Sequence, residues 1–101
     1  MPKMFFQIFI AGKSNRNEEL VKNYQQACNA LLLPNSFELT VIDLARNSQL
    51  AEEHKILATP TIIRSRPSPE KRVIGNLSQE GAVKALRFLL EDLNHTQHEK
   101  S

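Results

Sequence analysis

The sequence predicts one α/β domain, and three observations support this prediction. The chain has 101 residues, which is close to the usual size of a single domain. Its 41% hydrophobic and 24% charged residues are typical of an ordinary globular protein. Apolar runs of strand length alternate along the chain with segments of helical periodicity, which is the pattern of α/β proteins. Two independent domains and wholesale disorder are therefore excluded.

The first half of the chain predicts a strand, a helix and a second strand. Residues 3–11 are β-branched or aromatic with few polar interruptions, which is typical of a central strand covered on both faces. Asn15 and Glu18 have the spacing of a capping box and begin a helix with one apolar stripe. Pro34 ends this helix, and an alternating strand follows over 37–44. A helical crossover of this length implies that the two strands are parallel.

The second half predicts a short helix, two short strands and a final helix. Asn47 or Ser48 caps the short helix. The apolar residues of this helix are Leu50, Ala51, Ile56 and Leu57. The two strand candidates are 61–63 and 72–74, and Ser78 caps the final helix.

The segment 94–101 is polar and follows the last apolar residues of the final helix, so it predicts a fraying, disordered tail. The domain itself then covers residues 1–93. The predicted order of elements is β-α-β-α-β-β-α. This order matches the thioredoxin-like arrangement, in which helices pack on a mixed sheet.

Charge and cysteine content restrict the partners and the compartment. The formal net charge of +2 is too small to favour binding to a nucleic-acid backbone. The single cysteine, Cys28, cannot form an internal disulfide and excludes metal sites that need two thiolates. No apolar run reaches the length of about eighteen residues that a membrane span needs. We therefore expect a cytoplasmic protein without a membrane partner.

The middle of the chain carries several motifs that belong together. They are Ile42-Asp43, Asn47-Ser48-Gln49-Leu50-Ala51-Glu52-Glu53, Lys55-Ile56-Leu57-Ala58-Thr59-Pro60-Thr61, Arg64, Pro67, Pro69 and Arg72-Val73-Ile74-Gly75-Asn76-Leu77-Ser78. Only Thr59-Pro60 is widespread among thioredoxin-like proteins. The combination closely resembles the KaiB family of cyanobacterial circadian-clock proteins, and the resemblance extends from the first strand to the last helix.

The resemblance implies a non-enzymatic regulatory adaptor. KaiB-like proteins bind the hexameric ATPase KaiC on its amino-terminal ring and change its phosphorylation and output. They compete there with a sensor histidine kinase whose amino-terminal domain is similar to KaiB. A KaiC-like ATPase is therefore the expected partner, and such a kinase is the expected competitor.

The resemblance also implies two topologies for the part of the chain after about residue 47. A ground state, usually a tetramer, has the order β-α-β-β-α-α-β, and a rarer thioredoxin-like monomer binds KaiC. The β-α-β half is common to both states. We expect a homo-oligomer, a dimer or tetramer in the ground-state fold, at high concentration, because oligomer contacts favour the associated state.

Three prolines are candidates for the switch between the two topologies. Pro60, Pro67 and Pro69 interrupt the short strands of the second half. The peptide bond before a proline can be cis at a cost of only about 0.5 to 1 kcal/mol. Our hypothesis is that the Thr59-Pro60 bond is cis in the thioredoxin-like state, as in other thioredoxin-like proteins, and trans in the ground state.

The chain departs from the family pattern at several positions. Ser48, His54 and Asn76 stand where the family usually has Pro, Asp and Asp, and the tail 94–101 is not acidic. These departures indicate a divergent member of the family. They leave open whether the partner belongs to a circadian oscillator or to a simpler stress-response or timing module.

Five residues are the candidates for partner binding. Gln49 and Lys55 match positions in the segment that contacts the ATPase in the family. Glu53, Arg64 and Arg72 are added from charge placement alone. An acidic groove on the partner would attract the basic residues and make the association salt-sensitive. The alternative for Lys55 and Glu53 is that they are solvated helix charges.

A thioredoxin-like redox or glutathione-binding protein is the alternative function. Such proteins often carry Cys-x-x-Cys at the first helix, where this chain has Ser14-Asn15-Arg16-Asn17. Cys28 falls on the apolar stripe and is expected to be a small buried hydrophobe. We therefore predict no enzymatic activity and no cofactor, and a thiol-disulfide assay would separate the two functions. A detached sensor domain of a histidine kinase is a third possibility.

Two further clusters are assigned no binding role. Basic residues gather at Arg64, Arg66, Lys71 and Arg72. Because no aromatic residues are interleaved for base stacking, a solvated hairpin or an oligomer contact is favoured over nucleic-acid binding. His95 and His98 lack a third ligand nearby, so no metal site is predicted.

Overall fold

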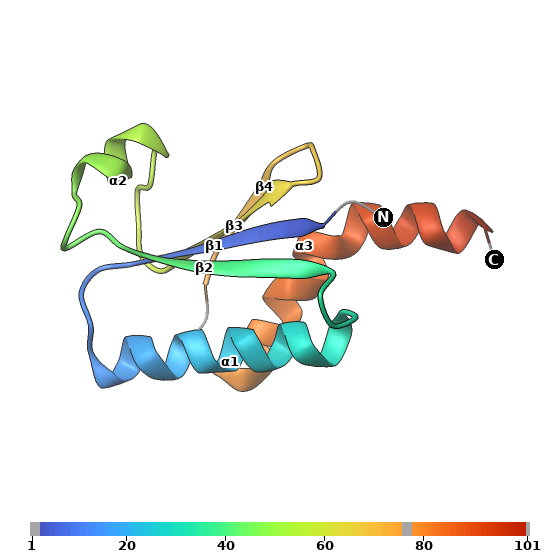
Figure 1. Cartoon of the computed structure of the whole chain (residues 1–101), viewed down its shortest axis with the longest axis horizontal. Coiled ribbons are helices and arrows are strands. Elements are labelled where there is room, and N and C mark those ends of the chain that lie inside the picture. The colour runs from blue at the N-terminus through green and yellow to red at the C-terminus, as the bar shows by residue number, and fades with distance from the viewer. Residues whose placement is uncertain (1–2, 76–77, 101) are drawn as a thin grey trace.

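Figure 1 shows the computed structural model, which describes residues 3–75 and 78–100, with side chains as far as residue 93. Its elements are β1 (Met4–Ile10), α1 (Asn15–Leu31), β2 (Phe37–Asp43), α2 (Gln49–Glu53), β3 (Thr61–Arg66), β4 (Lys71–Ile74) and α3 (Gln79–Lys100). This order confirms the predicted thioredoxin-like arrangement. The rearranged ground-state topology and the homo-oligomer stay predictions.

The four strands form one mixed sheet in the order β2-β1-β3-β4. β1 and β2 are parallel, as predicted, with Met4 opposite Phe37 and Ile10 opposite Asp43. β3 is antiparallel to both β1 and β4. Because β1 and β2 run in the same direction, the loops that lead into α1 and α2 leave the sheet at the same end (Figure 1).

Helices cover both faces of the central strand β1. Phe6 and Ile8 belong to the main core cluster, which α1 and α3 close on one face of the sheet. Phe9 points to the other face and packs with Leu44 and Ile63 in a second, smaller cluster. Residues of α2 lie against this second cluster. Burial on both faces explains why β1 is apolar with little alternation, as predicted.

The N-cap of the first helix lies one residue earlier than predicted. Ser14, rather than Asn15, is the N-cap, and its hydroxyl oxygen accepts the backbone N–H of Asn17 at 3.1 Å. Asn17 in turn donates from its side chain to the carbonyl of Gly12 at 2.6 Å. The backbone N–H of Gly12 donates to the Asp43 carboxylate at 2.8 Å, so the end of β2 holds the loop before α1.

Helix α2 is shorter than the apolar pattern predicts. It ends at Glu53, so Ile56 and Leu57 lie in the loop that follows rather than on the helix. Lys55 has a φ of 55°, a left-handed conformation that ends helical geometry. Ser48 is the N-cap, in agreement with one of the two predicted positions, although its side chain makes no capping hydrogen bond.

The final helix begins as predicted. The hydroxyl of Ser78 accepts the backbone N–H of Gly81 at 2.9 Å, which confirms Ser78 as the cap. Asn76 and Leu77, which belong to the family motif, lie outside the described residues. The backbone of α3 continues to Lys100 and so includes most of the segment predicted as a tail. The division into a domain over 1–93 and a disordered tail over 94–101 stays a prediction.

Each proline proposed for the switch follows a cis peptide bond. These bonds are Thr59-Pro60, Arg66-Pro67 and Ser68-Pro69. The Thr59-Pro60 bond is thus cis in the thioredoxin-like arrangement, as predicted. Its trans form in the other topology stays a prediction.

Candidate partner-binding surface

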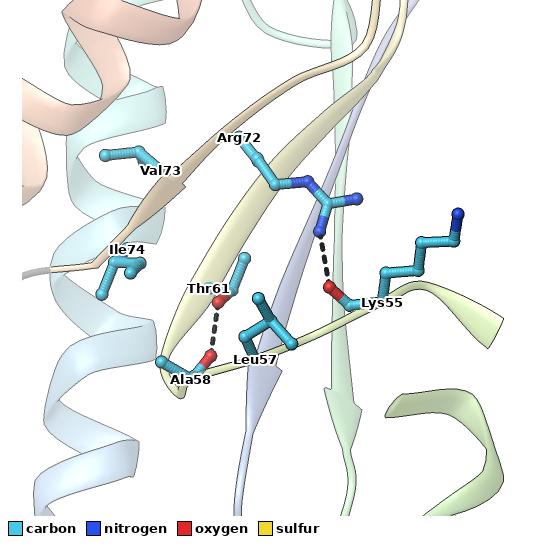
Figure 2. A pocket seen from close by; sticks show the side chains of 7 residues that line it. All are labelled: Lys55, Leu57, Ala58, Thr61, Arg72, Val73 and Ile74. Carbon is cyan, nitrogen blue, oxygen red and sulfur yellow. Dashed lines mark hydrogen bonds between the residues drawn. The ribbon is translucent and has the colours of Figure 1, made fainter. Parts of the chain in front are cut away.

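A hollow of about 250 Å³ lies between the loop after α2 and the strands β3 and β4 (Figure 2). We call its lining the loop–β4 surface; it consists of Lys55, Leu57, Ala58, Thr61, Arg72, Val73 and Ile74. Two strands of the sheet and a loop far from β4 in sequence therefore contribute to one surface. Lys55 and Arg72 lie on one side of it, and Val73 and Ile74 lie on the other (Figure 2).

Two large aliphatic side chains of this surface are uncovered. Leu57 is 98% exposed and Ile74 is 65% exposed. The preceding residue, Ile56, packs against the second core cluster, so Leu57 is carried outward by the same loop. Exposed aliphatic residues that gather around a hollow are typical of an interaction site.

The cations of the surface differ in their partners. Arg72 donates from one guanidinium nitrogen to the backbone carbonyl of Lys55 at 3.1 Å, which fixes the loop to β4. Its other terminal nitrogen lies 2.7 Å from the Glu70 carboxylate. Among the described residues, no carboxylate lies within ion-pair distance of the Lys55 ammonium. Lys55 can therefore pair with a carboxylate from outside the chain.

The structure brings together some of the residues predicted to bind a partner. Lys55 and Arg72 both line the hollow. Gln49 and Glu53 are exposed at the two ends of α2, which precedes the loop that carries Lys55. These four residues are open to solvent, and their role in binding stays a prediction.

Arg64 does not belong to this surface. Its side chain is 0% exposed, and its guanidinium donates to the backbone carbonyls of Leu89 and Pro69 and to the Asp92 carboxylate. Charge placement alone suggested a partner contact, because sequence does not show that Asp92 on α3 reaches β3. In this fold Arg64 is a buried structural residue and is withdrawn from the set of partner contacts.

The basic cluster around the β3–β4 hairpin is divided by the fold. Arg64 is buried, whereas Lys71 lies over the ring of Phe88 with 4.3 Å between its ammonium and the ring centroid. Arg72 faces the loop after α2. These three residues therefore face different neighbours in the fold.

The residues missed by sequence reasoning are the aliphatic ones. Leu57 was assigned to the apolar side of a helix, and Ile74 to a short strand. Their exposure depends on where α2 ends and on which edge of the sheet β4 occupies. The only local signal was the Ala58-Thr59-Pro60 segment, which predicts an extended chain before the proline and hence a loop rather than a helix.

The thiol of Cys28 is buried in the core. Burial raises the pKa of the Cys28 thiol to about 12, so the reactive thiolate is scarce near neutral pH. Within residues 3–75 and 78–93, no three His, Cys, Asp or Glu side chains gather as metal ligands would. His95 and His98 lie beyond the described side chains. None of the described helices has the length and apolar character of a membrane span.

Comparisons with known proteins agree with the sequence motifs. A sequence model described as the KaiB domain matches residues 7–89. The circadian clock oscillator protein KaiB of Trichodesmium erythraeum is 35% identical over 97 residues, which cover 91% of this chain and 88% of that protein. The circadian clock protein KaiB3 of Synechocystis is 33% identical over 83 residues, which cover 82% and 80% respectively.

Solved structures show the same fold at low identity. The N-terminal domain of SasA from Synechococcus elongatus has a TM-score of 0.72 and 17% identity, covering 91% of this chain and 87% of that one. Thioredoxin 1 from Thermosipho africanus has a TM-score of 0.64 and 21% identity, covering 90% and 99%. The fold is therefore thioredoxin-like. Because the KaiB sequence model spans both halves of the chain, including the whole loop–β4 surface, the chain belongs to the KaiB family.

Proposed function

We propose that this chain is a circadian-clock or stress-timing regulator that binds a KaiC-like hexameric ATPase and changes its phosphorylation and output. It acts as an adaptor and catalyses no reaction of its own. Family membership supports the proposal, because relatives of similar length are named circadian clock proteins. The observation that carries it is the loop–β4 surface, which combines the uncovered Leu57 with Lys55, whose ammonium has no ion-pair partner among the described residues.

Two forces would hold the partner on this surface. Burial of Leu57 and Ile74 would remove apolar area from water, at roughly 25 cal/mol for each Å². A carboxylate of the partner would pair with Lys55, which is exposed and therefore attracts it in a salt-dependent way. The apolar contact would supply most of the affinity, and the charge would supply rate and specificity.

A sensor histidine kinase with a KaiB-like domain is the proposed competitor. The likeness in fold to the N-terminal domain of SasA supports this part of the proposal. Two domains of one fold can present similar surfaces to the same ring, and then only one of them binds at a time. We further propose that the free chain forms a homo-oligomer, that it is located in the cytoplasm and that it uses no cofactor.

The test is capture of the purified full-length KaiC-like ATPase of the same organism by this chain, with ATP and with ADP. We expect the wild-type chain to retain the hexamer and the Lys55→Glu variant to bind about tenfold more weakly, because the reversed charge repels the partner carboxylate. Lys84→Glu is the control, because Lys84 is an exposed residue of α3, which covers the opposite face of the sheet.

The binding of the wild-type chain and of the two variants decides between three outcomes. Binding that is lost in Lys55→Glu and kept in Lys84→Glu supports the proposal. Failure of the wild-type chain to bind the ATPase in either nucleotide state would overturn it. Equal weakening in both variants would point to net charge rather than to the loop–β4 surface.

A further inference from the structure

Arg64 joins the β3–β4 hairpin to α3 from inside the protein. Its guanidinium donates to the backbone oxygen of Leu89 and to both carboxylate oxygens of Asp92, over 2.7 to 3.0 Å. A further bond of 2.6 Å reaches the carbonyl of Pro69, in the turn between β3 and β4. One buried side chain therefore holds the end of the hairpin against the middle of α3.

The β3–β4 hairpin contacts α3 with one face and the loop after α2 with the other. Successive side chains of a strand point to opposite faces of a sheet. Lys71 of β4 faces α3, where its ammonium donates to the carbonyl of Phe88 at 3.0 Å and lies 3.8 Å from Asp92. Arg72, the next residue, faces away from α3 and reaches the backbone of Lys55. A displacement of the hairpin along α3 must therefore move the loop–β4 surface as well.

A buried arginine is a poor choice for stability alone. Burying a charge is costly, and an aliphatic residue of similar volume often stabilises a core as well or better. The Nε atom of Arg64 is buried without a hydrogen-bond partner among the described residues, so its desolvation is not fully compensated. The planar guanidinium instead fixes the relative positions of the oxygens that it binds, because it donates to several of them at once.

We propose that Arg64 and Asp92 are positioning residues for the loop–β4 surface. Their ion pair sets the position of the hairpin on α3 and thereby the place of Arg72 and Ile74 relative to the loop that carries Leu57. The inference rests on the proposed function for its binding readout, since it concerns the same surface. It adds that residues without any contact to the partner control how well the partner binds.

The first test is hydrogen exchange of the full chain with Arg64→Met, which keeps the volume and removes the fork. We expect the amides of β4 and of α3 to exchange at least about tenfold faster, while those of β1 and β2 change much less. Leu20→Ala is the matched control, because Leu20 is a fully buried residue of α1, an element that carries neither Arg64 nor Asp92. Leu20→Ala should raise amide exchange in the chain generally, with no preference for the amides of β4.

The second test measures binding of the KaiC-like ATPase under conditions in which both variants remain folded. We expect Arg64→Met to weaken binding about fivefold or more and Leu20→Ala to leave it within about twofold of the wild type. Exchange that rises evenly over the sheet, or equal affinity of the two variants, would overturn the inference. If Arg64→Met does not fold, Arg64→Lys replaces it and should show the same selectivity, since lysine keeps the charge but not the fork.

The result also distinguishes this inference from the proposed function. Selective loosening of β4 and α3 by Arg64→Met supports the positioning role even when the wild-type chain does not bind the ATPase. In that case only the proposed partner is wrong. Binding by the wild type with no effect of Arg64→Met on exchange or affinity leaves the partner correct and the positioning role wrong.

Discussion

Ile56 and Leu57 are neighbours in the chain with opposite environments. Ile56 packs against the second core cluster beneath α2, whereas Leu57 is 98% exposed at the loop–β4 surface. The left-handed backbone of Lys55, just before them, turns the chain so that one residue anchors the loop and the next is presented to solvent. Structure and binding can therefore be tested separately at two adjacent positions.

Replacing Leu57 should affect binding and not folding. We expect Leu57→Ser to change the free energy of unfolding by less than about 0.5 kcal/mol, because the side chain makes almost no contacts in the free chain. Binding of the KaiC-like ATPase should weaken about tenfold or more, through loss of a buried aliphatic contact. Urea unfolding and a titration of the ATPase measure the two effects.

Replacing the neighbouring Ile56, as in Ile56→Ser, should affect folding. Because Ile56 is partly buried against the core, this change should lower the free energy of unfolding by about 1 to 3 kcal/mol. A Leu57→Ser variant that unfolds as readily as Ile56→Ser would show that Leu57 is packed in solution. That result would contradict the exposed position on which the binding site depends.

Gly75 is required by close packing rather than by its backbone angles. Its N–H donates to the carbonyl of Pro60 at 2.8 Å. A Cβ at this position would lie 2.5 Å from the Cδ1 atom of Ile62 and 3.2 Å from Cγ of Pro60. We expect Gly75→Ala to displace β4 from the loop and to lower the free energy of unfolding by about 1 to 3 kcal/mol. An unchanged urea midpoint would show that the neighbours yield without cost.

The ion pair between Arg64 of β3 and Asp92 of α3 predicts a pH dependence of stability. Hydrogen bonds from Arg64 lower the pKa of Asp92, with burial opposing and Lys71 adding a smaller effect. The folded pKa is then below the unfolded value of about 3.9, so the stabilisation is complete above that value and is lost as pH falls through the folded pKa. Stability should therefore decrease towards acid.

The variant Asp92→Asn isolates this contribution. We expect the difference in stability between wild type and Asp92→Asn to be constant at neutral pH and to shrink below about pH 4. Arg64 and Lys71 are the charged side chains that face Asp92 from β3 and β4. Thermal unfolding between neutral and acid pH measures the effect. A difference that persists unchanged at the lowest pH would mean that the Asp92 carboxylate is not the titrating group.

Local sequence signals predicted most of the fold. The continuous apolar run of β1 indicated a central strand, and Ser78 marked the start of α3, because both depend on residues close together in the chain. The parallel pairing of β1 and β2 followed from the length of the crossover between them. The end of α2 was predicted wrongly, because the apolar spacing that continues to Leu57 was followed rather than the loop signal of Ala58-Thr59-Pro60. The left-handed backbone at Lys55 follows the last helical residue, Glu53.

The candidate site was predicted in part. Lys55 and Arg72 were named from motif position and charge, and the fold places them on the same surface. Arg64 was assigned wrongly because its partner, Asp92, is 28 residues away in sequence and meets it only after α3 packs on the sheet. Local composition does not indicate that a charged residue will be buried and paired with a carboxylate that is distant in sequence.

The most direct measurement of the central claim is a hydrogen-exchange footprint of the wild-type chain on the KaiC-like ATPase. We predict that binding protects the amides of residues 55–58 and 71–75, which build the loop–β4 surface, and leaves those of α1 unchanged. Protection confined to α1 or α3, with exchange at residues 55–58 unaltered by saturating ATPase, would contradict the account.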